Sequence, residues 1–273
     1  MKRRNVIRHL FVILALICTT THATSNPSCH LSSSSGHIQE QIPEKYRGKY
    51  QRWKKEFLIT ETGRRQWEAI DNQPALTLII TISQDRASDA FAGEFRWDEA
   101  ANLTNATITL GCNIDSCCPD PIYYPVLSSL KKLDPLDGPI LAAAKMAHEF
   151  DHVNQAITGG TAYRNESEMS HIYSSVFLRN GYNANDPRLV ALTEKMGRTP
   201  VEIGEDREHR AEIQALRYLL ERVKEDEFRR KFLASLKKTI SVFARSFQPK
   251  YVEFLGSQDR ANTRPALAVK TNK

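Results

Sequence analysis

Two histidines and a glutamate near the middle of the chain have the types and spacing of a metal-dependent hydrolytic site. His148, Glu149 and His152 form an H-E-x-x-H pattern. On a helix, residues four apart lie on the same face, so both imidazoles can reach one zinc ion at about 2.0–2.1 Å. Glu149 lies on the flank of that site, where its carboxylate can take a proton from zinc-bound water. The pattern predicts zinc as the cofactor, His148 and His152 as its ligands, and Glu149 as the catalytic base.

The residues around this pattern carry the signals of a single helix. Asp137 can cap a helix that begins near Pro139, where a proline costs no hydrogen bond. The sequence continues as ILAAAKMAHEFDHVNQAI up to Gly159 and Gly160, which predict the end of the helix. We therefore expect the histidine pair on one face of this helix.

Strand patterns precede this helix and helical patterns follow it. Residues 42–70 have the periodicity of one or two amphipathic helices. Strands are expected over 75–83, 92–97 and 106–110, and later helices over 166–180, 187–196, 203–224 and 225–245. This order predicts an α+β fold, in which a small antiparallel or mixed sheet packs on the H-E-x-x-H helix and a mostly helical C-terminal half follows.

The first residues have the composition of a secretory signal peptide. Basic residues within positions 2–8 precede an unbroken apolar run over 10–18 and a Thr-His-Ala step that ends at Ala23. The run is shorter than the roughly 18–20 apolar residues of a membrane-spanning helix. We expect cleavage after Ala23, export to the periplasm or the extracellular space, and no stable membrane anchor after cleavage.

The expected organisation is a signal peptide over 1–23, a flexible leader over 24–41, a catalytic domain over 42–255 and a flexible tail over 256–273. Residues 1–23 hold four basic and no acidic residues, so their removal lowers the net charge from +6 to +2. That balance offers no case for nucleic-acid binding. We expect a monomer.

Four cysteines remain after removal of the signal peptide. They are Cys29, Cys112, Cys117 and Cys118. An even number in an oxidising compartment predicts up to two disulfides, with three possible connectivities. Free structural thiols are the alternative.

A second acidic stretch offers the third protein ligand that a catalytic zinc requires. The segment E-H-R-A-E-I-Q-A over 208–215 resembles the E-x-x-A-D-x-x-A helix of the gluzincin metallopeptidases, with Glu212 where the family usually has Asp. The resemblance implies that Glu208 binds zinc and that Glu212 orients a ligand histidine through its second ring nitrogen. Other residues open to the ligand role are Glu166, Glu168, Glu205 and His171.

The gluzincin resemblance implies a zincin-like fold and a secreted metallopeptidase that hydrolyses peptide bonds with a metal-activated water. In these families the strand ahead of the active-site helix is an exposed sheet edge that binds substrate as an added strand, and 106–110 is the candidate here. Candidate donors to the oxyanion are His171, Tyr163, Tyr218 and Arg217.

Two alternatives remain open. H-E-F-D-H also resembles the H-E-x-D-H helix of peptide deformylases, which implies a metal amidohydrolase with an upstream cysteine as third ligand. Cys112 lies at a comparable distance, but the family's E-G-C-L motif reads L-G-C-N here. The second alternative is a non-catalytic exported protein that binds zinc or a partner on a peptidase scaffold. Glu149 argues against it, because metal binding alone does not need that residue.

Overall fold

The computed structural model describes residues 37–116, 138–180 and 185–222, together with a few positions between 233 and 258. The fold is α+β, with a four-stranded mixed sheet and a mostly helical C-terminal half, as predicted. In chain order the elements are β1 (Ile38–Gln41), α2 (Glu44–Leu58), α3 (Glu61–Asp71), β2 (Thr77–Ser83), β3 (Ala90–Trp97), β4 (Leu103–Gly111), α5 (Gly138–Asn180), α6 (Pro187–Met196) and α7 (Pro200–Arg222).

The sheet has the strand order β1-β2-β4-β3. Strands β1, β2 and β4 are parallel, and β3 pairs antiparallel with β4 at one edge. Strand β4 therefore lies inside the sheet, and the prediction that 106–110 forms an exposed edge is wrong. Among the described strands, the edge on that side is β3, which pairs only with β4.

A bulge in β3 changes which of its residues face the helices. The register of β3 against β4 shifts between Gly93 and Arg96, and Glu94 has a φ of 52°. Before the bulge, Ala92 is buried in the core, and after it Phe95 packs against the same core. A bulge adds one residue to a strand and so reverses its alternation. The sequence pattern, read without the bulge, does not predict this change of face.

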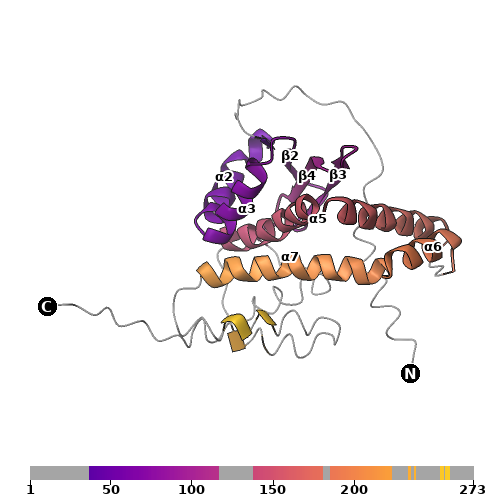
Figure 1. Cartoon of the computed structure of the whole chain (residues 1–273). Helices are drawn as coiled ribbons and strands as arrows, with labels where there is room; N and C mark the ends of the chain where they lie inside the picture. The colour runs from indigo at the N-terminus through magenta and orange to yellow at the C-terminus, as the bar shows by residue number, and fades with distance from the viewer. Residues whose placement is uncertain are drawn as a thin grey trace.

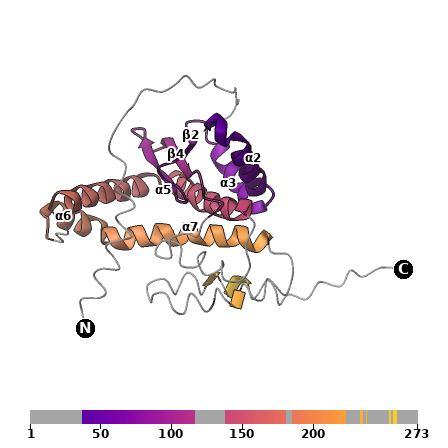
Figure 2. The same ribbon diagram turned by 180° about the vertical axis from the view of Figure 1, so that it is seen from behind.

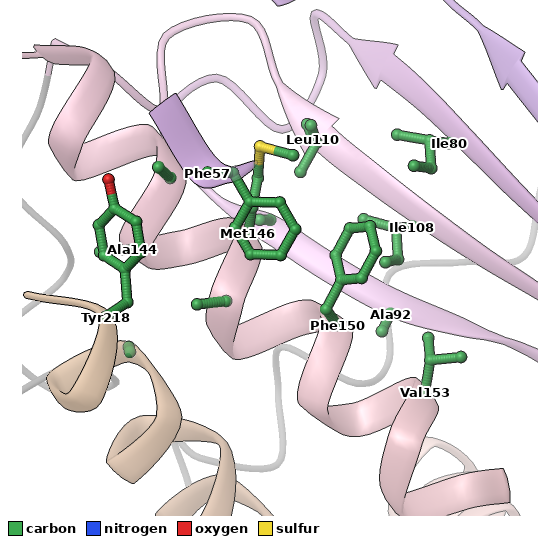
Figure 3. Packing of buried hydrophobic residues seen from close by; sticks show 14 of the residues in the cluster. Phe57, Ile80, Ala92, Ile108, Leu110, Ala144, Met146, Phe150, Val153 and Tyr218 are labelled. Atoms are coloured by element: carbon green, nitrogen blue, oxygen red, sulfur yellow. The ribbon is translucent and has the colours of Figure 1, made fainter. Parts of the chain in front are cut away.

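Helix α5 lies at the centre of the molecule. It packs on the sheet and on α2 and α3, while α7 runs along its other side (Figures 1 and 2). Met146 and Phe150 of α5 lie against Leu110 and Ile108 of β4 (Figure 3). Residues 142–153 are all buried. This explains the alanine-rich sequence before His148, because a helix covered on every side has no exposed polar face.

The ends of several elements differ from those predicted. Strand β1 was not expected, and its residues fall in the range assigned to the leader. The sequence IQEQ has little strand preference of its own, and pairing with β2 holds it in place. At Gly160 the helical geometry is interrupted, as expected, with φ 48° and ψ −126°. The chain then resumes as a helix at once and continues to Asn180.

Several predictions concern residues outside the described ranges. They include the signal peptide, Cys29, Cys117, Cys118, most of the expected helix over 225–245 and the tail beyond 258. Cleavage, export and disulfide pairing therefore stay predictions. Within the described ranges, no helix is both long and apolar enough to cross a membrane.

Candidate metal centre

Three side chains from two helices converge between α5 and α7. His148 Nε2 lies 3.2 Å from His152 Nε2 and 3.2 Å from Glu208 Oε2. His152 Nε2 lies 3.5 Å from Glu208 Oε1. The four-residue spacing places the histidines on one face of α5, and α7 brings Glu208 to that face. Among the described residues, this is the group of His, Cys, Asp and Glu side chains whose geometry could hold a metal ion.

The spacing of these atoms fits a single zinc ion. Three tetrahedral ligands at about 2.0–2.2 Å from zinc lie ~3.3–3.6 Å from one another. The observed separations are 3.2, 3.2 and 3.5 Å. A ring nitrogen of neutral histidine has one lone pair or one proton, so His148 Nε2 cannot hydrogen-bond fully to both of its neighbours. A cation between the three side chains would satisfy them together, and two imidazoles with one carboxylate form a donor set that zinc accepts.

The metal-binding group is closed on the α5 side and open at Glu208. The side chain of His148 is 1% exposed, that of His152 11% and that of Glu208 43%. Burial lowers the pKa of His148, but the hydrogen bond to Glu208 and the charges of Glu149, Glu208 and Glu212 outweigh it and raise that pKa to about 9. For Glu208, burial acts to raise the pKa, and the two histidines overcome it and hold the pKa far below its usual value.

Glu149 is buried beside this group without belonging to it. The residue is 2% exposed. Burial raises the pKa of its carboxyl, while the charges of His148 and His152 oppose the rise. A raised pKa makes a carboxylate a better proton acceptor, which is the property a general base requires.

Glu212 lies one turn after Glu208 on α7 and is also buried. It is 2% exposed, and its negative charge contributes to the raised pKa of His148. Ala211 and Ala215 are fully buried in the region where α7 packs on α5. Their small side chains let the two helices approach closely, which brings the Glu208 and Glu212 carboxylates near the histidines.

The structure separates the candidate oxyanion donors. Tyr218 is not at the site, because its hydroxyl donates to Glu56 Oε1 at 2.9 Å in the core between α2 and α7. His171 is exposed on the second stretch of α5, ~16 Å along the helix axis from Gly160. Arg217 lines a separate pocket between α3, α5 and α7. The Tyr218 hydroxyl is therefore occupied by a partner outside the metal-binding group, and the roles of His171 and Arg217 stay predictions.

Tyr163 remains a candidate donor. It lies on the first turn after the break at Gly160 and is 5% exposed. Burial raises the pKa of its hydroxyl to about 12, against the charge of Arg207, and the charge of Glu208 adds to the rise. The Arg207 guanidinium lies 3.6 Å from the centre of the Tyr163 ring. A neutral phenol held in this way can donate a hydrogen bond at ordinary pH.

The other possible third ligands lie elsewhere or are occupied. Glu166 Oε2 accepts hydrogen bonds from two nitrogens of Arg207, at 3.0 and 3.2 Å. Cys112 follows the end of β4, where its carbonyl accepts a hydrogen bond from Lys49 Nζ at 2.7 Å. Among the described residues, Cys112, Glu168 and Glu205 do not belong to the metal-binding group.

Three residues beside the site were not predicted from the sequence. Asp89 lies in the turn before β3, and its charge raises the pKa of Glu149. Lys145 is buried one turn before His148 and donates to the carbonyl of Ser88 at 2.6 Å. Arg207 precedes Glu208 and binds the second stretch of α5. No local pattern marks these residues, because their partners lie far away in the sequence.

Comparison with models of known protein families, with curated proteins and with solved structures finds no match to this chain. Its function is therefore inferred from its own residues and geometry.

Proposed function

We propose that the chain is an exported zinc metallopeptidase of the gluzincin type, with a zincin-like catalytic domain. The observation that carries the proposal is the position of Glu208. This residue is 60 positions from His148 in the chain, yet its carboxylate lies against the Nε2 atoms of both histidines. A chance H-E-x-x-H helix has no reason to meet a carboxylate from the E-x-x-A-E helix in this way. The N-terminal signal pattern supports export.

The proposed roles combine the positions of these side chains with the roles that the gluzincin resemblance implies. His148, His152 and Glu208 would hold the metal, and three protein ligands leave one position open for water. When bound, zinc lowers the pKa of a coordinated water toward about 7 and polarises a carbonyl. Glu149 accepts the proton of the attacking water and passes it to the leaving amine. Glu212 orients a ligand histidine, and Tyr163 donates a hydrogen bond to the oxygen of the attacked carbonyl.

The edge strand β3 supports a peptide as the substrate. Its partner on one side is β4, and it packs beside α5, which carries the histidines. An extended peptide can add to a free sheet edge through main-chain hydrogen bonds, and this mode reads the peptide backbone. Strand β3 therefore replaces 106–110 as the proposed substrate strand.

The proposal is tested with Glu149→Gln, because the amide removes the base and leaves the three ligands in place. The variant should keep about one zinc per chain, while hydrolysis of unfolded protein or peptide substrates falls by about 10²–10⁴-fold. Metal analysis and a peptidase assay measure the two quantities.

The control is the double variant His148→Ala/His152→Ala, which should lose the zinc. Full activity of Glu149→Gln, or stoichiometric zinc in the double variant, would overturn the mechanism. A zinc-loaded wild-type chain that cleaves none of a broad set of unfolded proteins and peptides would favour the non-catalytic binding protein.

A further inference from the structure

A pocket of about 650 Å³ lies on another side of α5 from the metal-binding group, between α3, α5 and α7. Its lining includes Gln66, Asp151 and Arg217 but none of the metal-binding residues. Its volume is within the ~300–1,000 Å³ range of pockets that bind small molecules. The proposed peptidase mechanism gives it no role.

Gln66, in the lining of this pocket, carries a buried acceptor without a partner among the described residues. Gln66 is 7% exposed, and its Nε2 donates to the carbonyl of Ala147 at 2.9 Å. A carbonyl only accepts, so this contact identifies the other amide atom as the oxygen. Oε1 is buried and has no hydrogen-bond partner among the described residues. An unpaired buried acceptor costs free energy and adds a partial negative charge beside the pocket.

The charged groups of the pocket are of both signs and lie at different depths. Asp151 is 8% exposed, whereas Arg217 is exposed, as is Arg65, which lies 3.7 Å from Glu61. Glu221 accepts from the backbone N–H groups of Glu61 and Thr62 at 2.6 and 3.1 Å, so it caps α3. A polyanion would be repelled by the carboxylates, and a polycation by the arginines.

We propose that this pocket binds a small zwitterion, a free amino acid or a short peptide. Its ammonium group would lie at the buried end, beside the carboxylate of Asp151, whose Oδ2 also accepts a hydrogen bond from Gln155 Nε2 at 2.7 Å. Its carboxylate would lie at the mouth, where Arg217 and Arg65 donate. Among the described residues that line the pocket, none is an aromatic side chain on which a sugar ring could stack.

The pocket adjoins the metal site through α5. Gln66 binds the carbonyl of Ala147, which precedes His148, and Asp151 precedes His152. A ligand that contacts Gln66 and Asp151 therefore touches the helix beside both histidines. Binding itself does not depend on the proposed hydrolysis.

The test is calorimetric titration of the full chain with dialanine and, separately, with alanine. The protein is treated with a chelator first, so that no metal can bind the ligand. We expect saturable binding of at least one of the two, and N-acetyl-dialanine amide, which lacks both charges, should bind at least about tenfold more weakly. Dialanine alone would assign a peptide, and alanine alone a free amino acid.

Arg217→Gln and Asp151→Asn should each weaken binding by about tenfold or more, because each removes one charged hydrogen bond. Arg210→Gln is the matched control, since Arg210 is an exposed arginine of α7 that pairs with Asp206 at 3.0 Å and does not line the pocket. Its affinity should equal that of the wild type. Absence of saturable binding by either zwitterion, equal binding of the capped dipeptide, or full affinity of both pocket variants would overturn the proposal. Glu149→Gln should bind as the wild type does, so failure here is distinguishable from failure of the hydrolytic mechanism.

Discussion

At the scale of single residues, the metal-binding group is held together by opposite charges in a buried place. Burial disfavours charge on His148 and on Glu208, yet their contact raises the pKa of the histidine to about 9 and lowers that of the carboxylate. A metal ion must therefore displace a proton from His148 at neutral pH. Glu208 serves both states, because it stabilises the charged histidine without metal and is the proposed ligand with metal.

Removal of Glu208 tests the assignment of the third ligand. Glu208→Ala should weaken zinc binding by more than the 10- to 100-fold that loss of an outer-shell partner costs, because it removes a direct ligand. Glu212→Ala should weaken binding by about 10- to 100-fold. Competition with a chelator of known affinity measures both.

Cys112→Ser is the control for these variants, because Cys112 lies outside the metal-binding group. Its zinc affinity should equal that of the wild type. The reverse pattern, with zinc lost in Cys112→Ser and kept in Glu208→Ala, would make Cys112 the ligand and favour the deformylase-like alternative.

At the scale of elements, the break in α5 decides what surrounds Glu208. After Gly160 the second stretch of α5 packs beside α7 (Figure 1). There the guanidinium of Arg207 donates to the carbonyl of Tyr163 at 3.0 Å and to Glu166. A straight α5 would carry Tyr163 away from Arg207. The break at Gly160 and the hydrogen bond from Arg207 together hold Tyr163 in place near Glu208.

Gly160→Ala should destabilise the protein, because φ 48° with ψ −126° lies in a region that side chains with a Cβ avoid. We expect a loss of about 1–3 kcal/mol in the free energy of unfolding, measured by urea denaturation. The matched control is Gly48→Ala in α2, where a Cβ meets nothing within 4 Å. That change should leave stability unchanged or raise it by up to ~1 kcal/mol. Equal stabilities of Gly160→Ala and the wild type would show that the break is not strained.

At the scale of the whole molecule, the site is built into the core. Helix α5 has the sheet and α2 and α3 on one side and α7 on the other (Figures 1 and 2), and its fully buried stretch contains both histidines. Protonation at the site is therefore linked to the stability of the fold.

This linkage predicts how the stability of the metal-free chain depends on pH. The pKa of His148 is about 9 in the folded state, above its ordinary value of 6.5, so the protonated histidine stabilises the fold. That contribution is complete below pH 6.5 and is lost as the pH rises through 9. Burial also raises the pKa of Glu149, so its contribution to stability likewise decreases as the pH rises. The Tm of chelator-treated protein should fall between pH 6.5 and pH 9 by on the order of 5 °C.

His148→Gln is the control for the pH dependence. The amide does not titrate, so the fall in Tm over this range should be smaller than in the wild type. An equally large fall in the variant would assign the effect to other groups.

Local patterns in the sequence were enough to predict several secondary-structure elements and the histidine pair of this protein. The H-E-x-x-H spacing placed two histidines on one helix face, apolar periodicity identified three of the four strands, and the glycines at 159 and 160 marked the break in α5. Such features depend on neighbouring residues, so they can be inferred from a single sequence. The pairing of Glu208 with these histidines was inferred by resemblance, since Glu166, Glu168 and Glu205 fit the local chemistry as well.

Only the tertiary structure decided which distant groups meet. The packing of α7 on α5, close because Ala211 and Ala215 are small, brings Glu208 to the histidines and directs Tyr218 into the core. The order of strands places β3 at an edge of the sheet. Pairing with β2 holds β1, which the strand preference of its own residues did not predict. These outcomes depend on contacts between segments far apart in the chain, whose free energy comes from burial and pairing that no short stretch of sequence contains.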